Sequence, residues 1–130
     1  MGGDEGWSCS TEFAADASSA SGARAFVTHH LLEHDLGYLV DDMQLVVSEL
    51  ATNAMLHAHT PYTVTLGALE GSVRLEVLDG SQIGPVMVLA RGLDTGGRGV
   101  EIVNAVSRDW GVIANTSGGK SVWAEFNRRA

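Results

Sequence analysis

The sequence predicts an α+β fold, a two-layer sandwich in which helices cover one face of a mixed, mostly antiparallel sheet. The first observation is the order of hydrophobic periodicities, which runs strand, helix, helix, strand, strand, long loop, helix, strand, strand. The second is size and composition: 130 residues, 45% hydrophobic and 18% charged, suit one domain with its own core. We therefore expect residues 1–6 to form a flexible tail and residues 7–128 to form a single domain.

One strand and two helices are predicted in the N-terminal half. Residues 7–13 alternate between apolar and polar side chains, as a half-buried strand does. Residues 18–36 follow a helical period, and Gly37 is expected to cap this helix. Its apolar stripe consists of Ala20, Ala23, Val27 and Leu31. A second helix is expected after Asp41 and Asp42, whose charges suit a helix N-terminus.

A hairpin is predicted after the second helix, which should extend to about residue 58. Residues 63–68 and 73–77 both alternate with a period of two. The turn residues Glu70-Gly71-Ser72 lie between the two runs. The sequence therefore predicts two neighbouring antiparallel strands.

The rest of the chain combines a long loop with a helix and two strands. Residues 80–97 have no regular period. A loop of that length in a compact domain is either misassigned or functional, and a lid is the usual functional case. A third helix is expected after Gly99. Strands at about residues 111–114 and 120–126 complete the sheet.

Charge is distributed unevenly. Residues 1–50 hold nine acidic residues and one basic residue, a net charge of −8, whereas residues 51–130 hold seven of each. An acidic surface repels nucleic acid and favours a basic protein partner, although it also simply keeps a protein soluble. We therefore expect no direct binding to nucleic acid.

Cysteine content and hydropathy indicate where in the cell the protein is expected. The single cysteine, Cys9, excludes an internal disulfide and fits a reducing cytoplasm. No stretch approaches the roughly 20 apolar residues that a membrane-spanning helix needs. We expect a cytoplasmic protein without a membrane partner.

A polar stripe on the second helix is the most informative feature. Glu49, Asn53 and His57 are four residues apart, so they share one side of the helix next to its apolar face. A polar stripe against a buried face is unfavourable unless a ligand or partner meets it. The spacing alone leaves two interpretations open: an exposed helix edge or a ligand site.

Three further segments combine polar or glycine residues with element ends. Asp79 ends an apolar strand, where a lone Asp is most often a turn residue. Residues 95–100, Thr-Gly-Gly-Arg-Gly-Val, open a helix and could cradle a phosphate or form a flexible turn. Residues 118–123, Gly-Gly-Lys-Ser-Val-Trp, lead into the last strand and could be an ordinary glycine hairpin.

Two histidine pairs could suggest zinc ligands. His30 and His34 lie one helical turn apart beside Glu33, and His57 and His59 follow the polar stripe. We interpret the first pair as solvated helix residues and His57 as a contact at the end of the stripe.

Together, the four segments resemble the GHKL ATPases, the superfamily of gyrase, heat-shock chaperones, histidine kinases and MutL. The segments are Ser-Glu-Leu-Ala-Thr-Asn-Ala at 48–54, Val-Leu-Asp at 77–79, Gly-Gly-Arg-Gly-Val at 96–100 and Gly-Lys-Ser-Val-Trp at 119–123. The likeness spans about residues 7–126 and is greatest to the small bacterial anti-sigma-factor serine kinases. It implies a Bergerat-type, histidine-kinase-like ATPase fold.

The resemblance also implies a role for each matching residue. Glu49 matches a catalytic general base, and Asn53 matches a ligand of the Mg²⁺ that accompanies ATP. Asp79 matches the aspartate that accepts a hydrogen bond from the adenine amino group, and Ser121 matches a hydroxyl that helps to recognise adenine. The second glycine box, which would hold the phosphates, is formed by Gly97, Arg98, Gly99 and Val100.

The first glycine box departs from the pattern of the wider superfamily. That pattern is Asp-x-Gly-x-Gly, whereas this chain reads Asp79-Gly80-Ser81, with its glycine one place early. Two functions therefore remain open. One is a non-catalytic module that binds nucleotide or sequesters a partner; the other is a kinase.

The kinase would be an ATP- and Mg²⁺-dependent protein serine kinase of a partner-switching system that regulates transcription. Its substrate would be a serine of an anti-anti-sigma (antagonist) protein. A sigma factor would be the competing partner. The resemblance also leaves a homodimer open.

Overall fold

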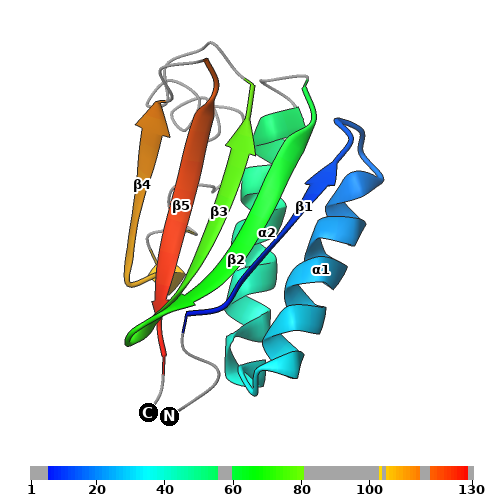
Figure 1. Cartoon of the computed structure of the whole chain (residues 1–130). Coiled ribbons are helices and arrows are strands. Elements are labelled where there is room, and N and C mark those ends of the chain that lie inside the picture. The colour runs from blue at the N-terminus through cyan, green and yellow to red at the C-terminus, as the bar shows by residue number, and fades with distance from the viewer. Residues whose placement is uncertain (1–5, 56–59, 81–102, 104, 115–117, 129–130) are drawn as a thin grey trace.

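The computed structural model describes residues 6–55, 60–80, 103, 105–114 and 118–128. These residues form a five-stranded sheet with two α-helices on one face (Figure 1). The elements are β1 (Ser8–Phe13), α1 (Ser19–Glu33), the 3-10 helix η1 (Gly37–Leu39), α2 (Val40–Asn53), β2 (Tyr62–Leu69), β3 (Ser72–Asp79), β4 (Asp109–Ala114) and β5 (Lys120–Asn127). The predicted α+β sandwich is confirmed.

The strands follow the order β1-β2-β3-β5-β4, and each of the four described pairs is antiparallel. The sheet was expected to be mixed, but no parallel pair occurs among the described strands. β2 and β3 form the predicted hairpin, with Leu69 opposite Ser72. Gly71 in its turn has φ +78°, a conformation in which a side chain is strained.

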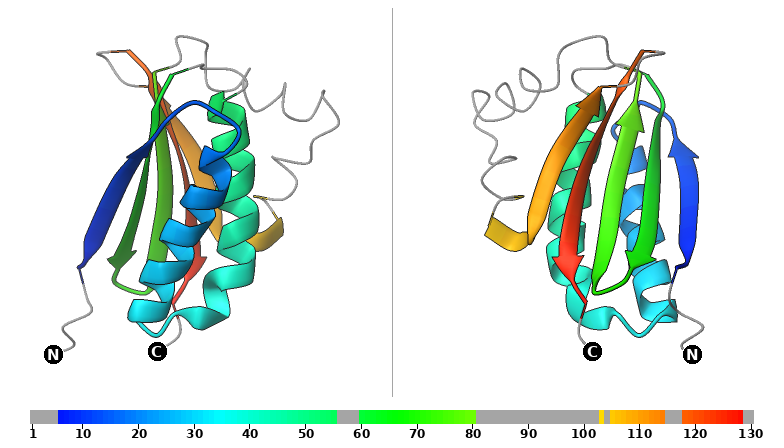
Figure 2. Two further views of the ribbon diagram at one scale, coloured as in Figure 1. Left: turned by 90° about the vertical axis from the view of Figure 1, so that its right-hand side faces the viewer. Right: turned by 60° about the vertical axis from the view of Figure 1, so that its left-hand side comes forward.

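The core consists of apolar side chains of the two helices and of the sheet. Figure 2 shows the helices and the sheet as two layers. Three residues of the predicted α1 stripe, Ala23, Val27 and Leu31, are fully buried. Every second residue of β2 and β3 is buried against them, which is the expected consequence of strand alternation. Within the described residues, no helix is long and apolar enough to span a membrane.

Helix α1 ends earlier than predicted and without glycine. Asp35, not Gly37, adopts the left-handed conformation, with φ +61°. The backbone N–H of Leu36 donates to the carbonyl of Leu31 at 2.8 Å, and that of Asp35 donates to Leu32 at 3.3 Å. This Schellman arrangement satisfies two carbonyls of the last turn and places Leu36 in the core. Burial of Leu36 therefore fixes the end of the helix.

Helix α2 begins at Val40, so Asp41 and Asp42 occupy its first turn rather than precede it. Their carboxylates still complement the positive end of the helix dipole. The α-helix ends at Asn53, and the next two residues continue in a wider, π-type turn. π-Type turns are frequent at functional sites. Residues 56–58, to which the helix was predicted to extend, lie outside the described residues.

The predicted lid at 80–97 lies outside the described residues except for Gly80. Of the predicted third helix, residues 103, 105 and 106 are described, and they are helical. β4 begins at Asp109, slightly before the expected start, and β5 matches its prediction closely.

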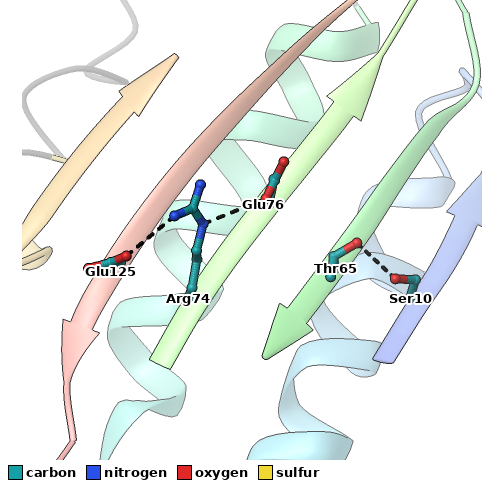
Figure 3. Close-up of polar contacts among 5 residues, drawn as sticks. All are labelled: Ser10, Thr65, Arg74, Glu76 and Glu125. Carbon is teal, nitrogen blue, oxygen red and sulfur yellow. Dashed lines mark hydrogen bonds and ion pairs between the residues drawn. The ribbon is translucent and has the colours of Figure 1, made fainter. Parts of the chain in front are cut away.

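The face of the sheet that the helices leave open carries polar cross-strand pairs (Figure 3). Arg74 of β3 lies 3.4 Å from Glu125 of β5 and 3.6 Å from Glu76. Its guanidinium also lies 4.5 Å from the ring centroid of Trp123. The open face is thus held by charge and stacking, and the helix face by apolar packing.

Candidate functional site

The candidate site lies at one end of the sheet, where β3 ends and β2 and β5 begin. Figure 1 shows the C-terminal end of α2 at this same end. The register aligns Tyr62, Asp79 and Lys120 in one row across the three strands. These residues alternate with the strand positions that face away from the helices, so all three side chains lie on the helix side.

Asp79 and Lys120 form a buried ion pair. The Nζ of Lys120 donates to the Oδ2 of Asp79, and the two side chains are only 2% and 3% exposed, respectively. A charged pair is rarely placed at the end of an apolar core, because both ions lose their hydration. This makes the row the most polar part of the core.

Lys120 is the site residue that the sequence analysis missed. It was quoted within the last of the four segments but given no role. The signal was present, because Lys120 continues the every-second-residue series of Val122, Ala124 and Phe126, all of which are buried.

Ser121 does not lie on the same side as Asp79. Its cross-strand partners are Leu78 of β3 and Ile113 of β4, so its side chain belongs to the open face. Ser121 is buried there, with 5% of its surface exposed. The structure therefore does not bring its hydroxyl to the helix face on which Asp79 lies.

The turn before β5 packs closely on the end of β3. Gly119 has φ +87°, and a Cβ at this position would lie 2.4 Å from the backbone oxygen of Asp79. Only glycine allows this approach. On the other side, the backbone N–H of Gly80 donates to the Oγ1 of Thr60 at 2.9 Å. The backbone around Asp79 is therefore held from two directions.

Glu49 and Asn53 lie one turn apart on α2, as the polar stripe predicted. Glu49 is half-buried, whereas Asn53 is 7% exposed. The Nδ2 of Asn53 is buried and has no hydrogen-bond partner among the described residues. A buried amide without a partner is unfavourable by about 1–3 kcal/mol, so this one indicates a place for a polar ligand.

A second polar contact ties three elements together at this end of the sheet. The hydroxyl of Tyr62, which is fully buried, lies 2.6 Å from the Oγ of Ser19 at the start of α1. The Oγ of Ser19 also lies 3.8 Å from the sulfur of Met55, which follows α2. These contacts fix the helix ends against the row that contains Asp79.

Several predicted residues lie outside the described part of the chain. They are Gly97, Arg98, Gly99 and Val100 of the second glycine box, and the histidines His57 and His59. The phosphate-binding half of the predicted site therefore stays a prediction.

The remaining histidines lie near the C-terminal end of α1. His34 stacks on Trp7 with ring centroids 3.8 Å apart. His29 and His30 each lie within 3.5 Å of a carboxylate oxygen of Glu33. One ligand atom from each of these last three side chains lies within 4.8 Å of the others, but two of the three residues are exposed. The interpretation of His34 as a solvated residue gives way to a stacking role.

The polar groups of the described site are of the kinds that bind a nucleotide and a divalent cation. Asp79 supplies a buried carboxylate, which can accept hydrogen bonds at about four positions. Asn53 supplies an amide whose oxygen is a suitable ligand for Mg²⁺ and whose nitrogen lacks a partner among the described residues. Both are buried at the edge of the apolar core.

A family model of the histidine kinase-like ATPase domain matches residues 13–126. This range includes every residue that the sequence analysis assigned to the site. No curated protein matches the chain.

Proposed function

This chain belongs to the histidine kinase-like ATPase domain family, and from that premise we propose that it is a protein serine kinase. The kinase binds ATP beside Asp79 and Asn53 and transfers the γ-phosphate to a serine of a partner protein. The observation that carries the proposal is a pair of buried polar groups at one end of the core: the carboxylate of Asp79 and the amide of Asn53, whose nitrogen has no partner among the described residues.

Each described residue has a defined task in this proposal. The carboxylate of Asp79 accepts a hydrogen bond from the amino group of adenine. The amide oxygen of Asn53 binds Mg²⁺. When bound, this cation would neutralise negative charge on the phosphates, which phosphoryl transfer requires.

Glu49 is the proposed general base. It takes the proton of the attacking serine hydroxyl as the serine oxygen bonds to the γ-phosphorus. The bond from that phosphorus to the bridging oxygen of ADP breaks at the same time, and ADP leaves. The half-buried position of Glu49 supports this role, because a partner's hydroxyl must reach its carboxylate.

The proposed partner is the antagonist protein of a partner-switching system, with a sigma factor as its competitor. The N-terminal 50 residues carry a net charge of −8 and include α1 and most of α2. Such a surface attracts a partner with a basic face and speeds its association at low salt. The cytoplasm is the proposed location.

A second function is favoured by one specific observation, the ion pair of Asp79 with Lys120. If the ammonium satisfies Asp79 without nucleotide, the domain could act by sequestering a partner and never transfer phosphate. Equilibrium binding separates the two functions. Failure to bind Mg·ATP at millimolar concentration would support the sequestering module and contradict the kinase.

The test of the kinase uses the full chain and ATP labelled at the γ-phosphate. Partners are captured with the protein as bait, with and without Mg·ATP, and are then offered as substrates. We expect Glu49→Ala to keep ATP affinity and to lose phosphate transfer by at least about 100-fold, the usual contribution of a general base. Glu70→Ala, in the exposed hairpin turn, is the matched control. Full transfer by Glu49→Ala would refute the assigned role.

A further inference from the structure

We propose that Lys120 is a positioning residue that gives the nucleotide site its preference for adenine, an inference that rests on the proposed function. Its ammonium binds the carboxylate of Asp79 inside the protein and fixes the position of that carboxylate beside the proposed adenine base. Neither the family match nor the four sequence segments assign Lys120 a role.

The geometry restricts Asp79 from several sides. Lys120 is its direct cross-strand partner, and their side chains meet on the buried helix face. Gly119 passes so close to the backbone of Asp79 that no side chain fits between them. Val77 and Val122, the next pair along the two strands on this face, are almost fully buried. The ion pair thus closes the apolar core at this end.

The chemistry of the pair explains how it would select a base. An ammonium has three donors and no acceptor, and an ionised carboxylate is an acceptor only. While Lys120 compensates its charge, Asp79 can receive a donor such as the amino group of adenine. Hypoxanthine presents a carbonyl oxygen at that position, and two acceptors facing each other repel. The paired carboxylate therefore favours ATP over inosine triphosphate.

The other described polar groups of the row and of the nearby end of α2 are not cations. From β2 it faces Tyr62, whose hydroxyl is hydrogen-bonded to Ser19. The polar groups toward this end of α2 are Glu49 and Asn53, neither of which is cationic. Lys120 supplies the ammonium that contacts the carboxylate of Asp79.

The experiment measures binding of Mg·ATP and of Mg·inosine triphosphate by calorimetry, with the fold checked by circular dichroism. We expect the wild-type chain to prefer ATP by about 10- to 100-fold, the usual effect of a hydrogen bond to a charged group. Lys120→Met should bring that ratio close to one, and Lys120→Arg should keep most of it. An unchanged ratio in a folded Lys120→Met variant would overturn the proposal, as would tighter binding of ATP.

Lys120→Met could also unfold the protein, because it leaves a buried charge without its counter-ion. Asp79→Asn and the double variant Asp79→Asn/Lys120→Met remain informative in that case. If Lys120 acts through Asp79, both variants should show the same ratio, within about two-fold. A further change of ratio in the double variant would overturn the proposal. Wild-type protein that binds neither nucleotide would instead refute the proposed function, and this inference with it.

Discussion

At the scale of single residues, the partners of buried polar groups distinguish groups that stabilise the fold from groups that could bind a ligand. The hydroxyl of Tyr62 and the carboxylate of Asp79 both have protein partners, at the same end of the sheet. Asn53 is nearly as buried, yet its amide nitrogen has no partner among the described residues. Among the described residues this nitrogen thus adds no hydrogen bond to the fold, which is the pattern expected of a binding residue.

We therefore expect Asn53→Ala to separate stability from binding. The free energy of unfolding should change by less than about 1 kcal/mol, because removal of the unfavourable buried amide offsets the packing lost with the side chain. Affinity for ATP in the presence of Mg²⁺ should fall by at least about 10-fold, since a ligand of the cation is removed. Urea unfolding and calorimetry measure the two quantities.

The control for this variant is Asn127→Ala, at the exposed end of β5. It should change neither quantity. Loss of stability by several kcal/mol in Asn53→Ala, with nucleotide affinity intact, would make Asn53 a structural residue.

Cys9 gives a second prediction at this scale. Burial of the thiol and, to a smaller extent, the negative charge of Glu33 raise the pKa of Cys9 above its ordinary value. The thiolate is the reactive form, so Cys9 should react slowly with a disulfide reagent at pH 8. Glu33→Gln removes the nearby charge and lowers the pKa, so the reaction should become a few-fold faster.

Glu70→Gln, which changes an acid in the hairpin turn, is the control for Cys9 and should leave the rate unchanged. Rates are followed by release of the coloured thiol from the reagent. Equal rates in Glu33→Gln and the wild type would show that the charge of Glu33 does not reach the thiol.

At the scale of elements, the backbone at the end of α1 has a conformation that is strained for a residue with a side chain. Among the described residues, Asp35 is the non-glycine residue that has a positive φ. Its carboxylate also lies at the negative end of the helix dipole. We expect Asp35→Gly to raise the free energy of unfolding by about 0.5–1 kcal/mol, because glycine adopts this conformation without a steric penalty.

The control is Asp41→Gly, in the first turn of α2, where the backbone is helical and the carboxylate complements the dipole. It should lower the free energy of unfolding by about 1 kcal/mol. Chemical denaturation measures both variants. A destabilised Asp35→Gly would mean that its carboxylate makes a contribution that outweighs the strain.

The same elements show how far the sequence can be interpreted. Alternation predicted the hairpin of β2 and β3 and the start of β5 because one face of each strand is buried. Propensity placed the end of α1 at Gly37, but burial of Leu36 decides it and makes Asp35 take the left-handed conformation. Tertiary packing, which a local pattern does not contain, overrode the glycine preference.

The helix residues of the candidate site could be placed from the sequence, whereas the facing of the strand residues could not. Helical spacing alone puts Glu49 and Asn53 on one side of α2, and the structure has them one turn apart there. Their roles come from the family resemblance and not from the spacing. Ser121 and Lys120 are neighbours, so a shift of one residue decides which of them faces Asp79. That choice depends on the pairing of β3 with β5, which is a long-range property.

At the scale of the whole molecule, the fold separates two sets of charged residues, one buried at the candidate site and one on the open face of the sheet. The ion pair of Asp79 lies between sheet and helices, whereas Arg74, Glu76 and Glu125 lie on the open face. A nucleotide that binds the first set should stabilise the whole domain, since small single domains unfold as one cooperative unit. Variants of the open face should not alter this linkage.

We therefore expect Mg·ATP at 100 times its dissociation constant to stabilise the wild-type fold by about 2.7 kcal/mol, which corresponds to a rise in melting temperature of roughly 10 °C. Arg74→Ala should lower the melting temperature without nucleotide yet show the same rise, because it removes only contacts of the open face. Asn53→Ala and Asp79→Asn should lose about half of the rise or more at the same ATP concentration, because a 10-fold weaker affinity leaves only about 1.4 kcal/mol of stabilisation. Glu49→Ala should keep the rise, because a general base acts on the attacking hydroxyl and not on ATP affinity. Scanning calorimetry with and without Mg·ATP measures all five proteins. If Arg74→Ala lost the rise while Asn53→Ala kept it, the nucleotide would bind the open face, and the site would have to be moved to the other side of the sheet.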